Sequence, residues 1–371
     1  MKSLNGLKLL LPLLIVAFAF ISCDTDENPV GTLEEIAGRI PNVEVIPNAD
    51  NATMHKRNDQ QYSLFTVEVS GIGFNNNISD GTYFGWCADM SKPRRTGEDI
   101  SNTNLFSTNK DERFNQLSYI VNNRPYYERQ YTDLSWKDIQ VAMWVVLETQ
   151  DYELSLIESK LPSFVNGYSA ENVNSIIDDL GDNGLDFKPG PGDKQLILMN
   201  AYDGSQPPLV EVCNTAWMKG QYKIADNNNA NHWGMYEGYK IEADNVLTRD
   251  LVFKEGPVHN PTYIPIGVVR IETIVENNNG FIRVTITMDD NDLMVSDDVH
   301  VHIEDSKPDQ APGQFPFDFE FIESIDEPRK NLTMQIPFTG VNKSGDDYDL
   351  TPVRDVYVAV HMGACKYVEE E

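Results

Sequence analysis

Two residues far apart in the chain carry side chains that can react with each other. Cys87 lies in the apolar stretch GWCADM, and Gln140 lies further along the chain in IQVAMW. A cysteine sulfur that attacks a glutamine carboxamide expels ammonia and leaves an internal thioester. Because water hydrolyses a thioester, this chemistry needs an aromatic setting from which water is excluded. Aromatic residues close to the pair in sequence can supply it: Tyr83, Phe84, Trp86, Trp136 and Trp144.

The segment SWKDIQVAMWVVLETQ, residues 135–150, predicts the helix that must position Gln140. Ser135 can cap this helix, and Asp138 follows three residues later, as in a capping box. Gln140 and Trp144 are four residues apart and therefore share a face of the helix. The same stripe holds further apolar side chains, namely Trp136, Met143 and Leu147. A glutamine in such a stripe costs free energy unless its amide is hydrogen-bonded.

The segment GTYFGWCADM, residues 81–90, predicts the strand that must position Cys87. Alternation places Gly85 and Cys87 on one face of this strand and Trp86 on the other. Asp89 follows two residues after the cysteine, where a carboxylate either positions a proton for acyl transfer or caps a turn. We favour the turn for Asp89.

The chain has four cysteines, Cys23, Cys87, Cys213 and Cys365, and its N-terminus predicts export to an oxidising compartment. If Cys23 is acylated, three remain and at most two can pair. A bridge between Cys213 and Cys365 would close the C-terminal half of the chain. That pairing leaves Cys87, which is then buried and inert, paired between chains, or chemically used.

An aromatic residue directly before Cys87, with the sequence QVAMW beginning at Gln140 on a downstream helix, resembles the Cys–Gln thioester domain of bacterial surface adhesins. The resemblance covers roughly residues 60–212 and implies that Cys87 and Gln140 are cross-linked. It further implies that an amine on a target, typically a lysine, attacks the acyl carbon. The expected product is an amide between Gln140 and the target, with the thiol of Cys87 released. Such a protein makes one bond per molecule and is not an enzyme.

The first residues resemble the leader of a bacterial lipoprotein. Lys2 and Lys8 precede an apolar run over residues 9–21, which is too short for an ordinary spanning helix. The run ends at Ser-Cys, and this lipobox-like pattern implies cleavage before Cys23 and its acylation. The acidic stretch over residues 24–31 resembles the surface-export signal of Bacteroidetes lipoproteins. We therefore expect a lipid-anchored, surface-exposed protein of the outer membrane; the alternative is an ordinary signal peptide with an incidental cysteine.

Composition and charge exclude several classes of protein. Hydrophobic residues make up 40% of the 371 residues, enough for two packed domains, so disorder is not expected. Without Lys2 and Lys8, 27 Lys and Arg stand against 58 Asp and Glu, a net charge of −31. Because such a charge repels nucleic acid and anionic lipid, no nucleic-acid partner is expected. Membrane attachment is then left to the N-terminal lipid.

The predicted organisation is a signal peptide over residues 1–22, a tether over 23–58, a thioester domain over 59–212 and a β-sandwich over 213–371. The tether includes one candidate strand at VEVIP. The thioester domain is expected to be α+β, a sheet with a helical insertion, so that the whole chain is mostly β. The C-terminal half resembles a β-domain that accompanies such modules in bacterial surface proteins, which supports its boundary and the pairing of Cys213 with Cys365.

Individual segments predict the remaining elements. Helices are expected within residues 111–124, 156–164 and 169–181, and strands within 62–72, 195–202 and 207–212. In the C-terminal half a hairpin is predicted over residues 268–276 and 281–288. A strand is expected over residues 315–322, whose alternation places Phe317, Phe319 and Phe321 on one face. A final strand is expected over residues 355–365.

Other chemistry is less well supported by the sequence. His300, His302 and His361 lie on predicted strands near Asp297, Asp298 and Glu304, but no fixed metal-ligand spacing is present, and we expect neither a metal nor another cofactor. The acidic loops at residues 289–292 and 344–349 do not match a Ca²⁺-binding loop. Two alternative functions remain open: a noncovalent binding lipoprotein, for glycan or protein, with a structural Cys87, and a carbohydrate-active enzyme with its two carboxylates among the 58 acids.

Overall fold

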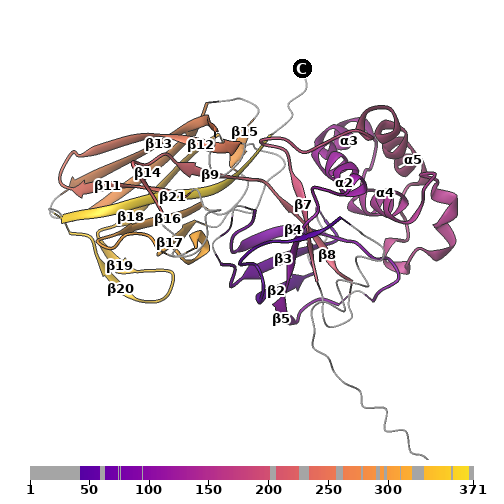
Figure 1. Ribbon diagram of the computed structural model, residues 1–371, viewed down its shortest axis with the longest axis horizontal. Helices are drawn as coiled ribbons and strands as arrows, with labels where there is room; N and C mark the ends of the chain where they lie inside the picture. The colour runs from indigo at the N-terminus through magenta and orange to yellow at the C-terminus, as the bar shows by residue number, and fades with distance from the viewer. Residues whose placement is uncertain are drawn as a thin grey trace, which may run out of the picture.

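The computed structural model shows two antiparallel β-sheets side by side, with a group of helices next to the first sheet (Figure 1). It describes residues 42–58, 63–73, 75, 77–93, 95–200, 206–224, 234–255, 262–276, 279–289, 293–295, 299–309, 311–319, 330–351 and 354–366. The predicted leader, Cys23 and most of the tether lie outside these residues. None of the helices in the described ranges is long and apolar enough to cross a membrane.

The first sheet has the strand order β1-β6-β7-β8-β4-β3-β2-β5 in the described part of the chain. Its strands are β1 (Glu44–Val45), β2 (Ala52–Arg57), β3 (Phe65–Ser70), β4 (Gly81–Cys87), β5 (Asp99–Thr103), β6 (Leu105–Ser107), β7 (Gln195–Met199) and β8 (Pro208–Val212). The predicted tether was too long: β2 lies within it, yet this strand pairs with β3 and β5 and buries Ala52 and Met54 completely.

The helices lie between β6 and β7 in the chain and pack together on one side of the first sheet (Figure 1). They are α2 (Glu112–Asn122), α3 (Arg124–Gln130), α4 (Trp136–Glu148) and α5 (Ala170–Asp179), followed by a π-helical turn over Leu180–Gly184. The predictions of α2, α4 and α5 are confirmed. Residues 156–164 form short 3₁₀ turns instead of the predicted helix, because Pro162 interrupts the run, and α3 was not predicted.

The C-terminal half of the chain is mostly β, as predicted. Its main sheet has the strand order β10-β11-β21-β9-β12-β13-β14-β18 among the described residues. Its strands are β9 (Asn214–Met218), β10 (Tyr222–Lys223), β11 (Met235–Ile241), β12 (Val246–Glu255), β13 (Thr262–Glu276), β14 (Asn279–Met288), β15 (Leu293–Val295), β16 (Val299–Glu304), β17 (Phe317–Phe319), β18 (Asn331–Pro337) and β21 (Arg354–Lys366); β19 (Thr339–Val341) and β20 (Asp347–Asp349) form a separate hairpin, and η5 (Pro312–Gln314) is a 3₁₀ turn.

Two predictions for this unit are confirmed, and a third is confirmed only in part. The hairpin pairs β13 with β14 up to Glu276 and Asn279, and the final strand is β21. The strand predicted over residues 315–322 is shorter, because β17 ends at Phe319 and Phe321 lies outside the described residues.

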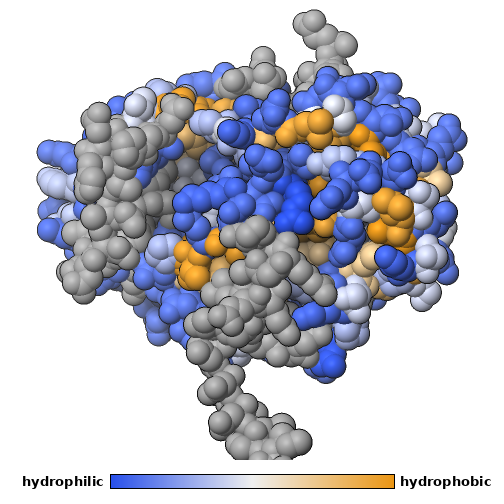
Figure 2. All heavy atoms as spheres, turned by 45° about the vertical axis from the view of Figure 1, so that its right-hand side comes forward, coloured by the Kyte–Doolittle hydropathy of each residue, from blue (hydrophilic) through white to orange (hydrophobic). Residues whose placement is uncertain are grey.

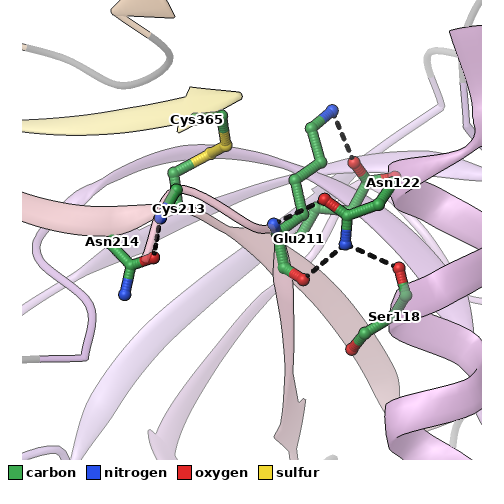
Figure 3. The surroundings of a disulfide bond; sticks show 8 residues. Ser118, Asn122, Glu211, Cys213, Asn214 and Cys365 are labelled. Atoms are coloured by element: carbon green, nitrogen blue, oxygen red, sulfur yellow. Dashed lines mark hydrogen bonds and ion pairs between the residues drawn. A yellow bond between two sulfur atoms is a disulfide. The ribbon is translucent and has the colours of Figure 1, made fainter. Parts of the chain in front are cut away.

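The chain passes from the first sheet to the second between Val212 and Asn214, and a disulfide lies at that junction. Cys213 is bonded to Cys365 at the end of β21, as predicted (Figure 3). Beside the disulfide, the main-chain N–H of Gly192 donates to Asn214 Oδ1 at 2.7 Å. Lys366 Nζ contacts a carboxylate oxygen of Asp193 at 3.1 Å. These contacts join β9 and the last strand of the second unit to the loop before β7 of the first.

Candidate functional site

Cys87 and Gln140 lie against each other in the core of the first unit. The main-chain N–H of Cys87 donates to Gln140 Oε1 at 2.8 Å, and Gln140 Nε2 donates to the main-chain oxygen of Cys87 at 3.0 Å. Both residues have 0% of their surface exposed. The carboxamide therefore pairs with Cys87 at both of its hydrogen-bonding positions, which brings together two residues 53 apart in sequence.

The edge of β4 is open to Gln140 because β3 does not extend that far. The β3–β4 ladder ends where Phe65 pairs with Gly85, two residues before the cysteine. On the other edge, β8 continues the pairing, with Cys87 opposite Pro208. Gly85 is required here, since a Cβ at this position would lie 2.5 Å from the ring of Phe65. The Gln140 amide thus takes the place that a neighbouring strand would occupy.

Helix α4 is anchored at its N-terminus so that Gln140 has a fixed position. The predicted capping box is present, with the main-chain N–H of Ser135 donating to Asp138 Oδ2 at 2.8 Å. The other oxygen of Asp138 accepts the main-chain N–H of Ser169, the N-cap of α5, at 2.6 Å. One buried carboxylate therefore starts α4 and fixes the beginning of α5 beside it.

Trp144, one helical turn beyond Gln140, completes the contact with Cys87. Its indole Nε1 donates to the main-chain oxygen of Cys87 at 3.0 Å, so this oxygen accepts two hydrogen bonds. The indole packs edge-on against Phe164, with ring centroids 6.1 Å apart. Trp136 lies one turn before Gln140 on the same helix and is nearly buried. Trp144 therefore touches the cysteine directly, whereas Trp136 belongs to the same helical face.

Trp86 turns away from the cysteine and is held by a buried ion pair. Its indole donates to Glu211 Oε1 at 2.6 Å, and the other oxygen of Glu211 accepts Lys194 Nζ at 3.1 Å. The guanidinium of Arg124 lies 5.9 Å from the centroid of the Trp86 ring. Figure 3 shows Glu211 on β8 close to Asn122, whose amide bonds the main chain of Lys194 at both ends. Strand β4 is thus fastened through Trp86 as well as through Cys87.

The thiol of Cys87 is neutral in this setting. Burial raises its pKa far above the usual value, and the negative charge of Asp89 raises it further, while hydrogen bonds with the Asp89 main chain and Trp144 and, less strongly, the ammonium of Lys56 lower it. The sulfur donates to the main-chain oxygen of Asp89 at 3.2 Å. The Asp89 carboxylate itself bonds Ser91, at its N–H and its hydroxyl, which supports the turn-capping interpretation of this residue.

Two buried polar residues near Cys87 were not anticipated from the sequence. Lys56 on β2 is 2% exposed, and its ammonium donates to the main-chain oxygen of Gln206 at 3.4 Å. The amide of Gln206 is 1% exposed and has no hydrogen-bond partner among the described residues. Alternation in ATMHKR places Lys56 on the face of Ala52 and Met54, a signal that the sequence did contain. No comparable signal marks Gln206.

The three histidines of the second unit form no metal cluster in the described residues. His300 pairs with His361 across β16 and β21, with ring centroids 5.7 Å apart, and bonds the Asp318 carboxylate at 2.9 Å. His302 bonds the main-chain oxygen of Ser306 instead. Asp297 and Asp298, which were considered with them, and residues 290–292 of one acidic loop lie outside the described residues.

Comparison with known proteins found no matching family model, no matching curated protein and no matching solved structure. The geometry of Cys87 and Gln140 is therefore the basis for assigning a function. It places a thiol, a carboxamide and a main-chain N–H together in a buried setting. In the view of Figure 2 the molecular surface is largely hydrophilic, with separate hydrophobic patches.

Proposed function

We propose that this protein is a surface lipoprotein adhesin that captures amine-bearing targets through an internal thioester between Cys87 and Gln140. The observation that carries the proposal is the double hydrogen bond between the Gln140 carboxamide and the main chain of Cys87, which holds the two residues against each other. The protein forms one covalent bond per molecule and does not turn over. Covalent capture exceeds the strength available to noncovalent contacts.

Thioester formation follows from the groups at the site. The sulfur of Cys87 attacks Cδ of Gln140, the C–N bond breaks, and the carboxamide nitrogen leaves as ammonia with the thiol proton. The main-chain N–H of Cys87 already donates to Oε1, the atom on which negative charge develops during the attack. When the carboxamide nitrogen leaves, Trp144 still donates to the main-chain oxygen of Cys87, so this buried acceptor keeps a partner.

In the capture of a target, a nitrogen is the attacking atom and the sulfur of Cys87 is the leaving group. A neutral primary amine attacks the acyl carbon of Gln140, the C–S bond breaks, and the nitrogen's proton passes to the departing sulfur. The products are an amide between Gln140 and the target and a free Cys87 thiol. The acidic chain favours targets with exposed lysines, because opposite charge increases the rate of encounter. We propose no cofactor for this reaction.

A noncovalent binding protein, for glycan or protein ligands, is the second candidate, and one observation favours it. The Gln140 amide has hydrogen bonds at both its oxygen and its nitrogen, so its burial is satisfied without a covalent bond. In that case Gln140 takes the place of a strand at the edge of β4, and Cys87 is structural.

Intact mass separates these two functions. The purified chain without its leader, measured under denaturing, non-reducing conditions, should be lighter than its disulfide-bonded sequence mass by one ammonia. Methylamine should add one molecule of amine and expose one thiol. Cys87→Ala and Gln140→Ala should each abolish the deficit. Full mass in the wild-type chain, with no uptake of methylamine, would refute the thioester and favour the noncovalent alternative.

Gln116 provides a matched control for the glutamine. It is 5% exposed on α2, its Nε2 donates to the main-chain oxygen of Leu185 at 3.4 Å, and its Oε1 accepts the hydroxyl of Tyr152 at 3.0 Å. It is therefore a buried, hydrogen-bonded helical glutamine whose hydrogen bonds involve no cysteine. Gln116→Ala should leave the mass deficit and the methylamine reaction unchanged, whatever its effect on stability.

Attachment to the outer membrane through Cys23 is part of the same proposal and is tested separately. Cells that express the chain are labelled with an alkyne fatty acid, and the purified protein is examined for the label. The wild-type chain should carry label, and Cys23→Ser should not. Protease treatment of intact cells should degrade a surface-exposed protein. If the wild-type protein carried no label, the proposed lipid anchor would be refuted, and the thioester proposal would be unaffected.

A further inference from the structure

A buried lysine lies close to the proposed thioester. Lys56 follows Ala52 and Met54 on the inner face of β2 and is 2% exposed. It pairs with Val67 on β3, and Val67 in turn pairs with Tyr83 on β4. A buried ammonium is costly compared with an apolar side chain of the same length. Its position on an otherwise apolar face therefore suggests a role beyond packing.

The ammonium of Lys56 extends to the chain segment opposite the end of β4. It donates to the main-chain oxygen of Gln206 at 3.4 Å. Pro207, the next residue, accepts the main-chain N–H of Ala88 at 3.0 Å, and Pro208 pairs with Cys87. Register therefore places Gln206 on the same face as Cys87, and its buried amide has no partner in the described residues. The Lys56 ammonium is thus held by the segment that pairs with the end of β4, where Cys87 lies.

We propose that Lys56 acts on Cys87 through its positive charge, supporting the sulfur as a thiolate when the thioester forms and when an amine opens it. The inference rests on the proposed thioester. In the forward step the sulfur must give up its proton before or during attack on Gln140. In the capture step the sulfur leaves the acyl carbon with the electron pair of the C–S bond. A buried site without a cation opposes charge on sulfur in both steps.

The charged groups around the sulfur are consistent with this role. Burial and the negative charge of Asp89 both raise the pKa of Cys87, whereas hydrogen bonds with the main chain of Asp89 and with Trp144 lower it, and the positive charge of Lys56 lowers it further. The main-chain oxygen of Asp89 accepts the thiol proton, and the Asp89 carboxylate is engaged by Ser91. The positive charge thus comes from β2, and the opposing negative charge comes from the turn after β4.

The test uses the full chain without its leader and begins from Gln140→Ala, in which no thioester can form. Alkylation of Cys87 by iodoacetamide is followed by mass across a range of pH. Below the pKa of the thiol, the rate follows the thiolate fraction and rises tenfold per pH unit. Lys56→Met should displace this profile to higher pH and slow alkylation by about threefold or more at a given pH. Lys56→Arg, which keeps the charge, should restore the rate.

Two controls separate charge from structure. Lys110→Met removes an exposed lysine that pairs with Glu44 and should leave the profile unchanged. Hydrogen exchange over β4 should be the same in Lys56→Met and Lys56→Arg, so that differences in local opening do not account for the rate. In the wild-type background, Lys56→Met should slow the methylamine reaction by a similar factor.

The two proposals fail by different results. An unchanged pH profile in Lys56→Met, or a Lys56→Arg variant as slow as Lys56→Met, would overturn the role of Lys56 and leave the thioester intact. Full mass of the wild-type chain would overturn the thioester, and with it the role of Lys56 in that reaction. Because the first result is measured on Gln140→Ala and the second on the wild type, neither outcome obscures the other.

Discussion

His361 should make the stability of the second unit depend on pH. Its imidazole is 2% exposed between the ring of Trp217, at 4.8 Å, and the ring of His300, at 5.7 Å. Its Nδ1 has no hydrogen-bond partner among the described residues. Burial lowers the pKa of His361 well below its ordinary value of 6.5, and the neighbouring His300 lowers it further. The folded protein therefore holds this histidine neutral.

The sign and size of the effect follow from proton linkage. Above pH 6.5 the histidine is neutral in both the folded and the unfolded chain, so it contributes no pH dependence there. Below pH 6.5 the unfolded chain takes up a proton that the folded chain does not, and the free energy of unfolding falls. From the unfolded value of 6.5, the loss between pH 8 and pH 5 is about 2 kcal/mol. Burial also lowers the pKa of His302, which adds a loss in the same direction.

The measurement compares the wild type with His361→Phe by urea denaturation at about pH 8, 7, 6 and 5. This range covers the pH values at which histidine ordinarily changes its charge. Phenylalanine keeps a ring against Trp217 and cannot be protonated. Effects of carboxylates and of His302 are common to both chains and cancel in the difference. Between pH 8 and pH 5 the free energy of unfolding of the variant should rise by about 2 kcal/mol relative to that of the wild type. A difference that stays constant across this range would show that His361 binds a proton in the folded chain as readily as in the unfolded chain, and would contradict its burial as a neutral group.

Two further predictions concern the site and the disulfide. Trp144→Phe removes a donor to the main-chain oxygen of Cys87. In a Cys87→Ala background Gln140 Nε2 still donates there, so the lost hydrogen bond should lower the free energy of unfolding by about 1 kcal/mol, beyond a packing loss that is common to both backgrounds. In the wild type a formed thioester has lost that nitrogen, so the loss should rise to about 2–3 kcal/mol; equal losses in both backgrounds would argue against the thioester. Replacing Cys213 and Cys365 by serine opens a cross-link across 152 residues and should cost up to about 5 kcal/mol by the chain-entropy relation. An unchanged urea midpoint for this double variant would contradict that estimate.

Local signals were sufficient for the helix that carries Gln140. Ser135 and Asp138 form the capping box that their spacing predicted, and Gln140 and Trp144 share a face because they are four residues apart. Both features depend on residues within one or two helical turns. The alternating pattern around Cys87 likewise placed the cysteine on a strand. Short-range periodicity therefore identified the two elements of the candidate site.

Features that depend on tertiary pairing were missed. β2 was assigned to the tether because only two apolar residues precede Lys56 on its inner face, and the sheet partners that bury this lysine are distant in sequence. α3 was not predicted; it follows α2 directly, and Pro125 occupies its first turn. The bond between Glu211 and Trp86 joins residues 125 apart, and no local pattern indicates it.

The arrangement of β4 explains how two ordinary side chains can react without an added cofactor. The indole of Trp86 is hydrogen-bonded to Glu211. The main-chain N–H and main-chain oxygen of Cys87 are both hydrogen-bonded to the carboxamide of Gln140. Helix α4 is fixed independently through Asp138. Formation of the proposed bond would move the Cys87 sulfur from the Asp89 oxygen to the acyl carbon of Gln140. Holding reactants in this way replaces a bimolecular encounter by an intramolecular step. The same hydrogen bonds that account for a buried, unreacted glutamine are thus the ones that would prepare it for attack, and the mass of the chain distinguishes the two states most directly.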